Sequence, residues 1–82
     1  MDKPTGRQIA AARTILGISQ ADLAARATVS VPTIKRMEAS DGSATGMANN
    51  VAAVCRALES AGVEFIAENG GGAGVRLRKG TP

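Results

Sequence analysis

The segment Ser19–Glu38, SQADLAARATVSVPTIKRME, decides the fold, because it predicts two short helices joined by a tight turn. Ser19 can cap the first helix, and Asp22 three residues later completes a capping-box pattern. Ser30 can cap the second helix. Pro32 falls in the first turn of that helix, where backbone amides have no intrahelical partner and proline is tolerated.

The apolar residues of these two helices predict one buried face and one exposed basic face. The inward positions are Leu23, Ala24, Ile34 and Met37, and the outward positions of the second helix include Lys35 and Arg36. A helix pair that presents a polar, basic second helix to solvent has the geometry that fits the major groove of DNA.

A further helix is predicted before this pair. Thr5 and Gln8 form a second capping-box pattern, and the helix runs to about Leu16, with Gly17 as a left-handed C-cap. The positions that share one face are Ile9, Ala12, Arg13 and Leu16. An arginine in such a stripe needs a partner, because burying an unpaired charge is costly, and we expect Glu38 to supply it.

After Glu38 the sequence predicts a polar loop and then a fourth helix, which begins between Thr45 and Asn50 and ends at Gly62. Its inward stripe is Val51, Val54, Cys55 and Leu58. Cys55 is interpreted as a small core residue, since a redox-sensing thiol needs exposure and a lowered pKa.

The last twenty residues change character. Val63–Ala67 and Val75–Arg78 have the composition and alternation of short strands, and the glycines of 70–74 predict a hairpin connection. Two strands alone are marginal in water, so they need the helical body or a second copy of themselves. We therefore divide the chain into a helical domain, 1–62, and a strand-turn-strand extension, 63–82. The extension is a dimerisation element through Val63, Phe65, Ile66, Val75 and Leu77.

Composition narrows the possible functions. With 82 residues the chain is one small domain, whose core supplies roughly 3–5 kcal/mol, and dimerisation would bury more surface. The net charge of +3 is a mild basic bias. A single cysteine excludes an intrachain disulfide and suits a reducing cytoplasm, and the absence of histidine leaves no ligand set for zinc. We expect no cofactor, and no signal peptide or membrane span, because no long apolar run occurs.

No catalytic constellation is present in the sequence. Carboxylates are scattered, and no nucleophile is paired with a base. The glycine run 70–74 lacks the following helix and the Lys-Ser/Thr pair of a phosphate-binding loop. We expect the protein not to be an enzyme.

The run Arg13–Glu38 resembles the lambda-repressor-like, or Xre, helix-turn-helix family. The shared pattern is Leu-Gly-x-Ser-Gln-x-acidic-Leu-Ala, an apolar-Ser turn, and then Thr-Ile-x-Arg-x-Glu. The resemblance implies a mainly α fold of four to five helices, here followed by a short C-terminal β-hairpin or strand pair. It also implies that Arg13 and Glu38 form a structural ion pair.

The resemblance also implies which residues meet DNA. The residue matching Gln20 contacts phosphate and braces the recognition helix, and the residue matching Asn49 lies where the backbone is touched. The full set of DNA-binding candidates is Gln20, Ser30, Val31, Pro32, Thr33, Lys35, Arg36 and Asn49.

Two departures from the family pattern matter. Thr28 stands where the family often has glycine, so a β-branched residue there is strained or the turn is rearranged. Val31 and Pro32 replace the usual glutamines and can offer only apolar contacts, such as to a thymine methyl group. Thr33, Lys35 and Arg36 remain as the polar readers, and specificity leans on Arg36 and on DNA shape.

The sequence therefore predicts a cytoplasmic, sequence-specific regulator that binds double-stranded DNA as a homodimer. The alternative is an antitoxin or anti-activator that uses the same scaffold to bind another regulatory protein, with its strands augmenting a partner's sheet. An RNA-binding or architectural role is weaker, because aromatic residues for base stacking are lacking.

Overall fold

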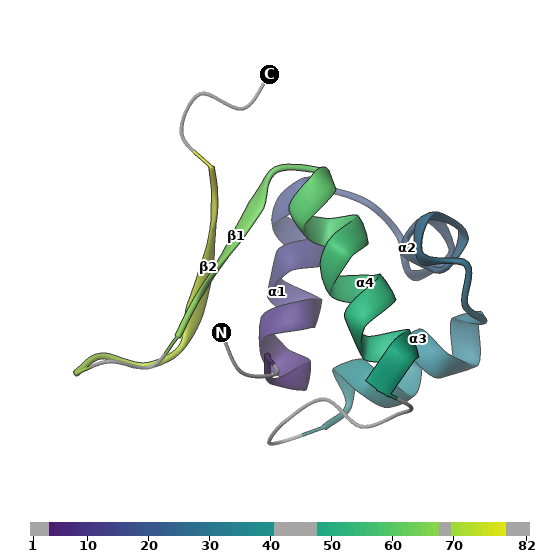
Figure 1. Ribbon diagram of the computed structural model, residues 1–82, viewed down its shortest axis with the longest axis horizontal. Helices are drawn as coiled ribbons and strands as arrows, with labels where there is room; N and C mark the ends of the chain where they lie inside the picture. Colours follow the sequence, from purple (N-terminus) through teal and green to yellow (C-terminus); the bar gives the residue numbers. More distant parts are fainter. Residues whose placement is uncertain (1–3, 41–47, 68–69, 79–82) are drawn as a thin grey trace.

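In the part of the chain that the structure describes, four helices and a two-stranded antiparallel sheet follow one another (Figure 1). The computed structural model describes residues 4–40, 48–67 and 70–78. The elements are α1 (Gly6–Leu16), α2 (Gln20–Ala27), α3 (Val31–Glu38), α4 (Ala48–Ser60), β1 (Val63–Ile66) and β2 (Gly74–Leu77). The mainly α fold with a C-terminal strand pair is as predicted, and the described residues form four helices. Most of the loop predicted after Glu38 lies outside the described residues.

The predicted caps are present at the starts of the first three helices. Thr5 accepts a hydrogen bond from the Gln8 amide, and the Gln8 side chain accepts one from the Thr5 amide in return. Ser19 and Asp22 form the same reciprocal box on α2, which is a second confirmed capping prediction. On α3, the hydroxyl of Ser30 accepts from the backbone amide of the third helical residue, and proline occupies the first turn.

Two helices end in left-handed residues. Gly17 closes α1 with φ 71°, as the sequence predicts. Thr28 closes α2 with φ 57°. The turn therefore has the positive φ that the resemblance leads us to expect, and the backbone of a β-branched residue is strained. A left-handed conformation costs an L-residue about 1–2 kcal/mol, so Thr28 is a local weak point of the fold.

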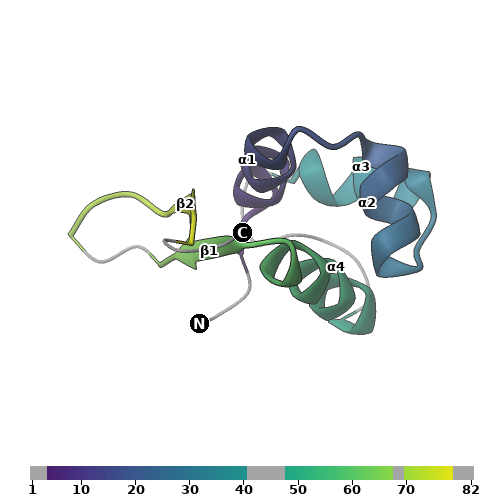
Figure 2. The ribbon, with the colours of Figure 1, turned by 90° about the horizontal axis from the view of Figure 1, so that it is seen from above.

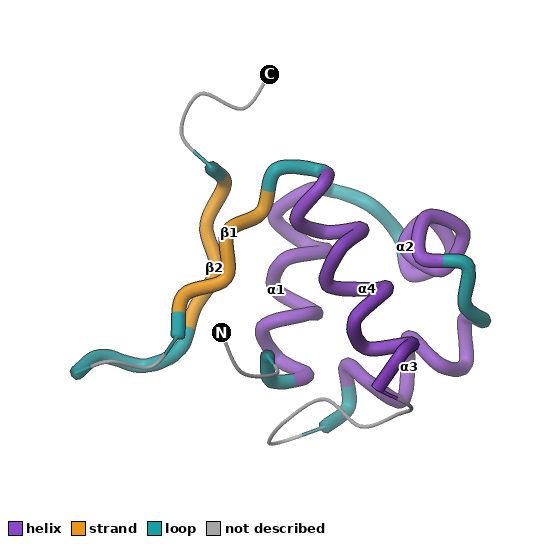
Figure 3. Tube along the Cα trace, viewed as in Figure 1, coloured by secondary structure: helices purple, strands orange, loops and turns teal. Residues whose placement is uncertain are grey.

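Figures 2 and 3 show the hairpin beside α1, with β1 following directly after α4. The apolar core is formed by residues of all four described helices and includes Val63 at the start of β1. The predicted inward faces are confirmed in large part, and Cys55 is only half-buried. The fully or nearly fully buried apolar residues are Ile9, Ala12, Leu23, Ala24, Ala27, Ile34, Met37, Val51, Val54, Leu58 and Val63.

Both strands end one residue earlier than predicted, and β2 also begins one residue earlier. Gly74 belongs to β2 rather than to the connection, while Ala67 and Arg78 lie outside the strands. The register pairs Val63 with Leu77 and Phe65 with Val75. Because directly opposite residues share a face, the apolar pairs of the hairpin face the helices, and β2 contacts α1 while β1 contacts α4.

Gln8 joins the hairpin to the helical body. This buried side chain is 5% exposed, and its Nε2 donates to the carbonyls of Ile66 at 3.2 Å and Gly74 at 3.0 Å. The same side chain accepts from the Thr5 amide through Oε1, so both ends of the amide group are satisfied. The strand extension predicted as 63–82 thus shares hydrogen bonds and core residues with the helices.

The first residue of α1 lies against the end of α3. A Cβ atom built on Gly6 would come 2.2 Å from the carbonyl oxygen of Met37 and 2.7 Å from that of Ser40. Glycine is required here by the close approach of two backbone segments. Its place was not apparent from the sequence, since Gly6 follows a predicted cap and looks like an ordinary first-turn residue.

Candidate nucleic-acid interface

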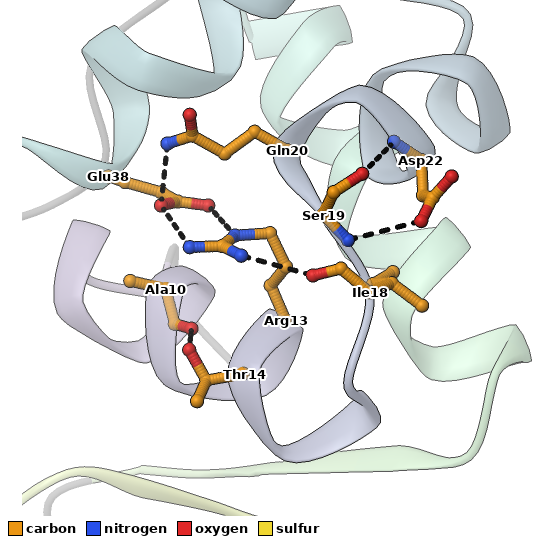
Figure 4. Close-up of polar contacts among 8 residues, drawn as sticks. All are labelled: Ala10, Arg13, Thr14, Ile18, Ser19, Gln20, Asp22 and Glu38. Carbon is orange, nitrogen blue, oxygen red and sulfur yellow. Dashed lines mark hydrogen bonds and ion pairs between the residues drawn. The ribbon is translucent and has the colours of Figure 1, made fainter.

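A polar network fixes the positions of the first three helices relative to one another (Figure 4). Arg13 on α1 donates from Nε to Glu38 Oε2 at 2.7 Å and from Nη2 to Glu38 Oε1 at 3.2 Å. Its Nη1 donates to the carbonyl of Ile18 at 3.0 Å. The hydrogen bond with Glu38 is the main reason that the pKa of Arg13 is raised. The structure therefore places the two residues of the expected ion pair in bidentate contact.

Gln20 completes this network from α2. Its Nε2 donates to Glu38 Oε1 at 3.1 Å, so the C-terminal residue of α3 is held from two helices (Figure 4). This hydrogen bond connects Gln20 to α3, the helix that the family resemblance expects it to brace. The rest of the half-buried side chain stays near the N-terminus of α2, where backbone amides and the helix dipole favour an anion such as a phosphate.

Several side chains at the start of α3 already make contacts within the protein, which the sequence did not indicate. Val31 is half-buried and packs against the core, and Pro32 is exposed. The hydroxyls of Ser30 and Thr33 lie 2.8 Å apart and hydrogen-bond to each other, while Ser30 Oγ also accepts the Thr33 amide. The Ser30 hydroxyl thus caps α3, and its bond with the Thr33 hydroxyl uses part of the hydrogen-bonding capacity of both groups.

The two basic residues of α3 are exposed and available. Lys35 and Arg36 point away from Ile34 and Met37, whose side chains are 0% exposed. In residues 4–40, 48–67 and 70–78, neither basic side chain forms an ion pair or a hydrogen bond. Asn49, in the first turn of α4, is also exposed.

A groove between α2 and α4 is a feature that the sequence did not indicate. It has a volume of about 530 Å³, and Arg26 and Arg56 lie beside a lining of small residues: Ala27, Ala53, Ala57, Ser60 and Ala61. The two arginines are thirty residues apart in the sequence, and only the packing of α2 on α4 brings them together. A local sequence pattern could not have found this pair.

The five residues predicted for dimerisation have different environments. Val63 is 0% exposed and belongs to the core of the protomer, so its side chain is not available to a second copy. Phe65 and Val75 are half-buried against that core, and Ile66 is half-buried. Leu77 is 50% exposed and is the most accessible of the set.

Other chemistry finds little support in the described part of the chain. No group of three or more His, Cys, Asp or Glu residues there is arranged to hold a metal ion. Burial raises the pKa of the Cys55 thiol, with a smaller contribution from Glu59, which disfavours a reactive thiolate. Among the described residues, no helix is both long enough and apolar enough to span a membrane.

The helices α2 and α3 are both capped and are joined by a tight turn. The buried face of α3 packs on the core, its Glu38 is bonded to α1 and α2, and its exposed face is basic. These features define a helix-turn-helix unit. The comparison with protein families agrees, because the family model described as "Helix-turn-helix" matches residues 9–48. The matched segment is similar to the lambda-repressor-like, or Xre, helix-turn-helix family, whose members are DNA-binding regulators and generally non-enzymatic. A search of curated proteins found no match.

Proposed function

We propose that this protein is a transcriptional regulator that binds specific double-stranded DNA as a homodimer, with α3 in the major groove. One observation carries the proposal. The buried face of α3 and its terminal Glu38 are held rigidly by the other helices, while Lys35 and Arg36 are exposed with no partner in the described part of the chain. A basic helix presented in this way can approach base edges without first breaking intramolecular contacts.

Arg36 is the principal base reader in this proposal. Arginine can donate two hydrogen bonds to guanine O6 and N7, the commonest specific contact in the major groove. Thr33 contributes less, because its hydroxyl is already paired with Ser30. Pro32 and the exposed part of Val31 are suited to a thymine methyl group. Few direct contacts with bases therefore determine the sequence preference, and the shape of the DNA contributes further specificity.

Phosphate contacts set the register of the complex. The N-termini of α2 and α4 present backbone amides, with Gln20 and Asn49 beside them, and Lys35 supplies a positive charge. A dimer would place two such units about 34 Å apart on a pseudo-palindromic site.

The decisive experiment begins with selection of bound sites from random DNA, which defines an operator. Arg36→Ala should then weaken binding to the operator by about 1–3 kcal/mol and relax the preference at one base position. Lys35→Ala should weaken all sequences alike and reduce the salt dependence of the binding constant by about one phosphate contact. Fluorescence anisotropy at several salt concentrations measures both effects.

Arg56→Ala is the matched control, because it removes an exposed arginine of α4 that lines the groove against α2 and is not part of α3. Its operator affinity should equal that of the parent. An Arg36→Ala variant that bound as tightly as the parent would refute the assignment of Arg36. A parent with no affinity for DNA even at low salt would refute the proposed function.

A second candidate function is binding of a protein partner, as in an antitoxin or anti-activator. The groove between α2 and α4 favours it, because Arg26 and Arg56 give this surface a charge that complements an acidic protein segment. Titration of the ¹⁵N-labelled protein with hexaglutamate should then shift resonances along the groove. The double variant Arg26→Ala/Arg56→Ala should abolish those shifts while leaving operator binding unchanged.

A further inference from the structure

The contacts at the two ends of the hairpin show which of its opposite residues form hydrogen-bonded pairs. The Arg78 amide donates to the Gly62 carbonyl at 2.7 Å, so this pair is a hydrogen-bonded one. At the other end, Gln8 reaches both the Ile66 and the Gly74 carbonyls, which is possible because the carbonyls of a hydrogen-bonded pair lie between the strands. Since the two kinds of pair alternate, every second residue turns its amide and carbonyl outward.

The outward-turned residues are Val63 and Phe65 on β1, and Val75 and Leu77 on β2. The β1 edge is closed at its start, because Val63 is 0% exposed, backbone included. The β2 edge is open at its end, where Leu77 is 50% exposed. No described residue hydrogen-bonds to the outward amides and carbonyls of β2. An edge of this kind is a template for another strand.

We propose that β2 of a second copy occupies this edge, antiparallel to β2 of the first, so that the assembly contains a four-stranded sheet in the order β1-β2-β2-β1. This inference deepens the proposed function and rests on its homodimer. Val75 lies opposite Leu77 of the second copy, and Leu77 opposite Val75. The pairing is isologous, and it uses every outward amide and carbonyl of those two residues.

The side chains of the helix-facing surface support a second copy as the occupant. In the paired sheet, Leu77 is covered by Val75 of the other chain on the face that packs on the helices. Ile15 on α1 is 45% exposed. Seven residues of α1 from Gln8 span about 10.5 Å, and three residues of β2 from Gly74 span about 10 Å, with the two elements running in the same direction (Figure 1). Equal rises from the contact between Gln8 and Gly74 therefore put the exposed side chains of Ile15 and Leu77 at about the same level along α1 and β2.

The opposite face of the sheet carries the charges. Arg76 donates to Glu64 at 3.0 Å within each hairpin, so the row across the assembly is Glu-Arg-Arg-Glu with no net charge. At the two-fold axis Arg76 lies directly opposite Arg76 of the second copy. This geometry can be tested, because Cβ atoms of directly opposite residues are about 4.5–5.5 Å apart.

The first test removes one outward amide. Leu77→Pro lacks the N–H that the second copy would use, and the β1–β2 ladder does not need that N–H. Leu77→Thr keeps the amide and strand propensity as a matched control. Sedimentation equilibrium should show a dimeric parent, a monomeric proline variant with an unchanged helical circular dichroism spectrum, and a dimeric threonine variant. A parent that is monomeric at its highest soluble concentration, or a proline variant as dimeric as the parent, would overturn the proposal.

The second test does not depend on proline. In a Cys55→Ala background, Arg76→Cys should form a disulfide-linked dimer under mild oxidation, because its Cβ atoms meet across the two-fold axis. Glu64→Cys lies in the same row but on the inner strand, and it should not cross-link. Equal cross-linking of the two variants, or preferential cross-linking through Glu64→Cys, would show that the two copies do not meet along β2 and would refute the β2 pairing.

DNA binding separates this inference from the function on which it rests. Leu77→Pro should keep the affinity of the parent for a single half-site and lose the additional affinity for the full operator. Arg36→Ala should remain dimeric and lose half-site affinity. A protein that dimerises without pairing of its β2 strands refutes only the proposed strand pairing. A protein that does not bind a half-site refutes the proposed DNA-binding function.

Discussion

The close approach at Gly6 makes a strong prediction about stability. In Gly6→Ala the new Cβ would lie 2.2 Å from the Met37 carbonyl oxygen, 2.7 Å from the Ser40 oxygen and 3.0 Å from the Ser40 nitrogen. Attractive contacts between such atoms begin near 3.5 Å, so the start of α1 must retreat from the end of α3 by about 1 Å. All three obstructing atoms are backbone, and no side-chain rotation can relieve the overlap.

The magnitude follows from two opposing terms. Overpacking costs about 1–3 kcal/mol, and the upper end applies here because the obstructing atoms are backbone. Alanine gains up to about 1 kcal/mol over glycine in a helix. The net loss of about 2 kcal/mol is a large share of the roughly 3–5 kcal/mol expected for a domain of this size. It corresponds to a decrease in Tm of roughly 8–16 °C.

Urea denaturation followed by circular dichroism measures this loss directly. Gly71→Ala is the matched control, because a Cβ at Gly71 meets nothing within 4 Å. That variant should be as stable as the parent or slightly more stable, through the reduced entropy of the unfolded chain. A Gly6→Ala protein with unchanged or increased stability would show that α1 and α3 do not approach each other as described.

Two further substitutions test the turn and the hairpin. Thr28→Gly should stabilise the protein by about 0.5–1 kcal/mol, because relief of the left-handed strain exceeds the added entropy of the unfolded chain, and a lower urea midpoint would contradict the strain at φ 57°. Gln8→Glu keeps a side chain that is common in capping boxes but replaces the donor to two strand carbonyls with an acceptor. It should destabilise hairpin docking by about 1–3 kcal/mol, seen as faster amide exchange in β1 and β2, while unchanged exchange would show that the Gln8 contacts do not hold the hairpin.

Much of the site could be predicted because its determinants are short-range. The caps at Thr5, Ser19 and Ser30 depend on side chains three residues apart, and the buried faces follow from helical periodicity. The contact between Arg13 and Glu38 could be anticipated from the cost of burying an unpaired arginine. It was harder to predict which polar side chains of α3 are unpaired, because the hydrogen bond between the Thr33 and Ser30 hydroxyls is not evident from the sequence.

The sequence by itself determined where the first three helices begin, the helix-turn-helix unit and the presence of two C-terminal strands, since local hydrogen bonding and apolar spacing specify these. Tertiary structure alone decided that Gly6 must be glycine, that Gln8 bridges to strand carbonyls 58 and 66 residues away, and that Val63 is core while Leu77 is exposed. These properties depend on how closely distant elements approach one another. No local pattern records that distance, because it is set by the packing of the whole core.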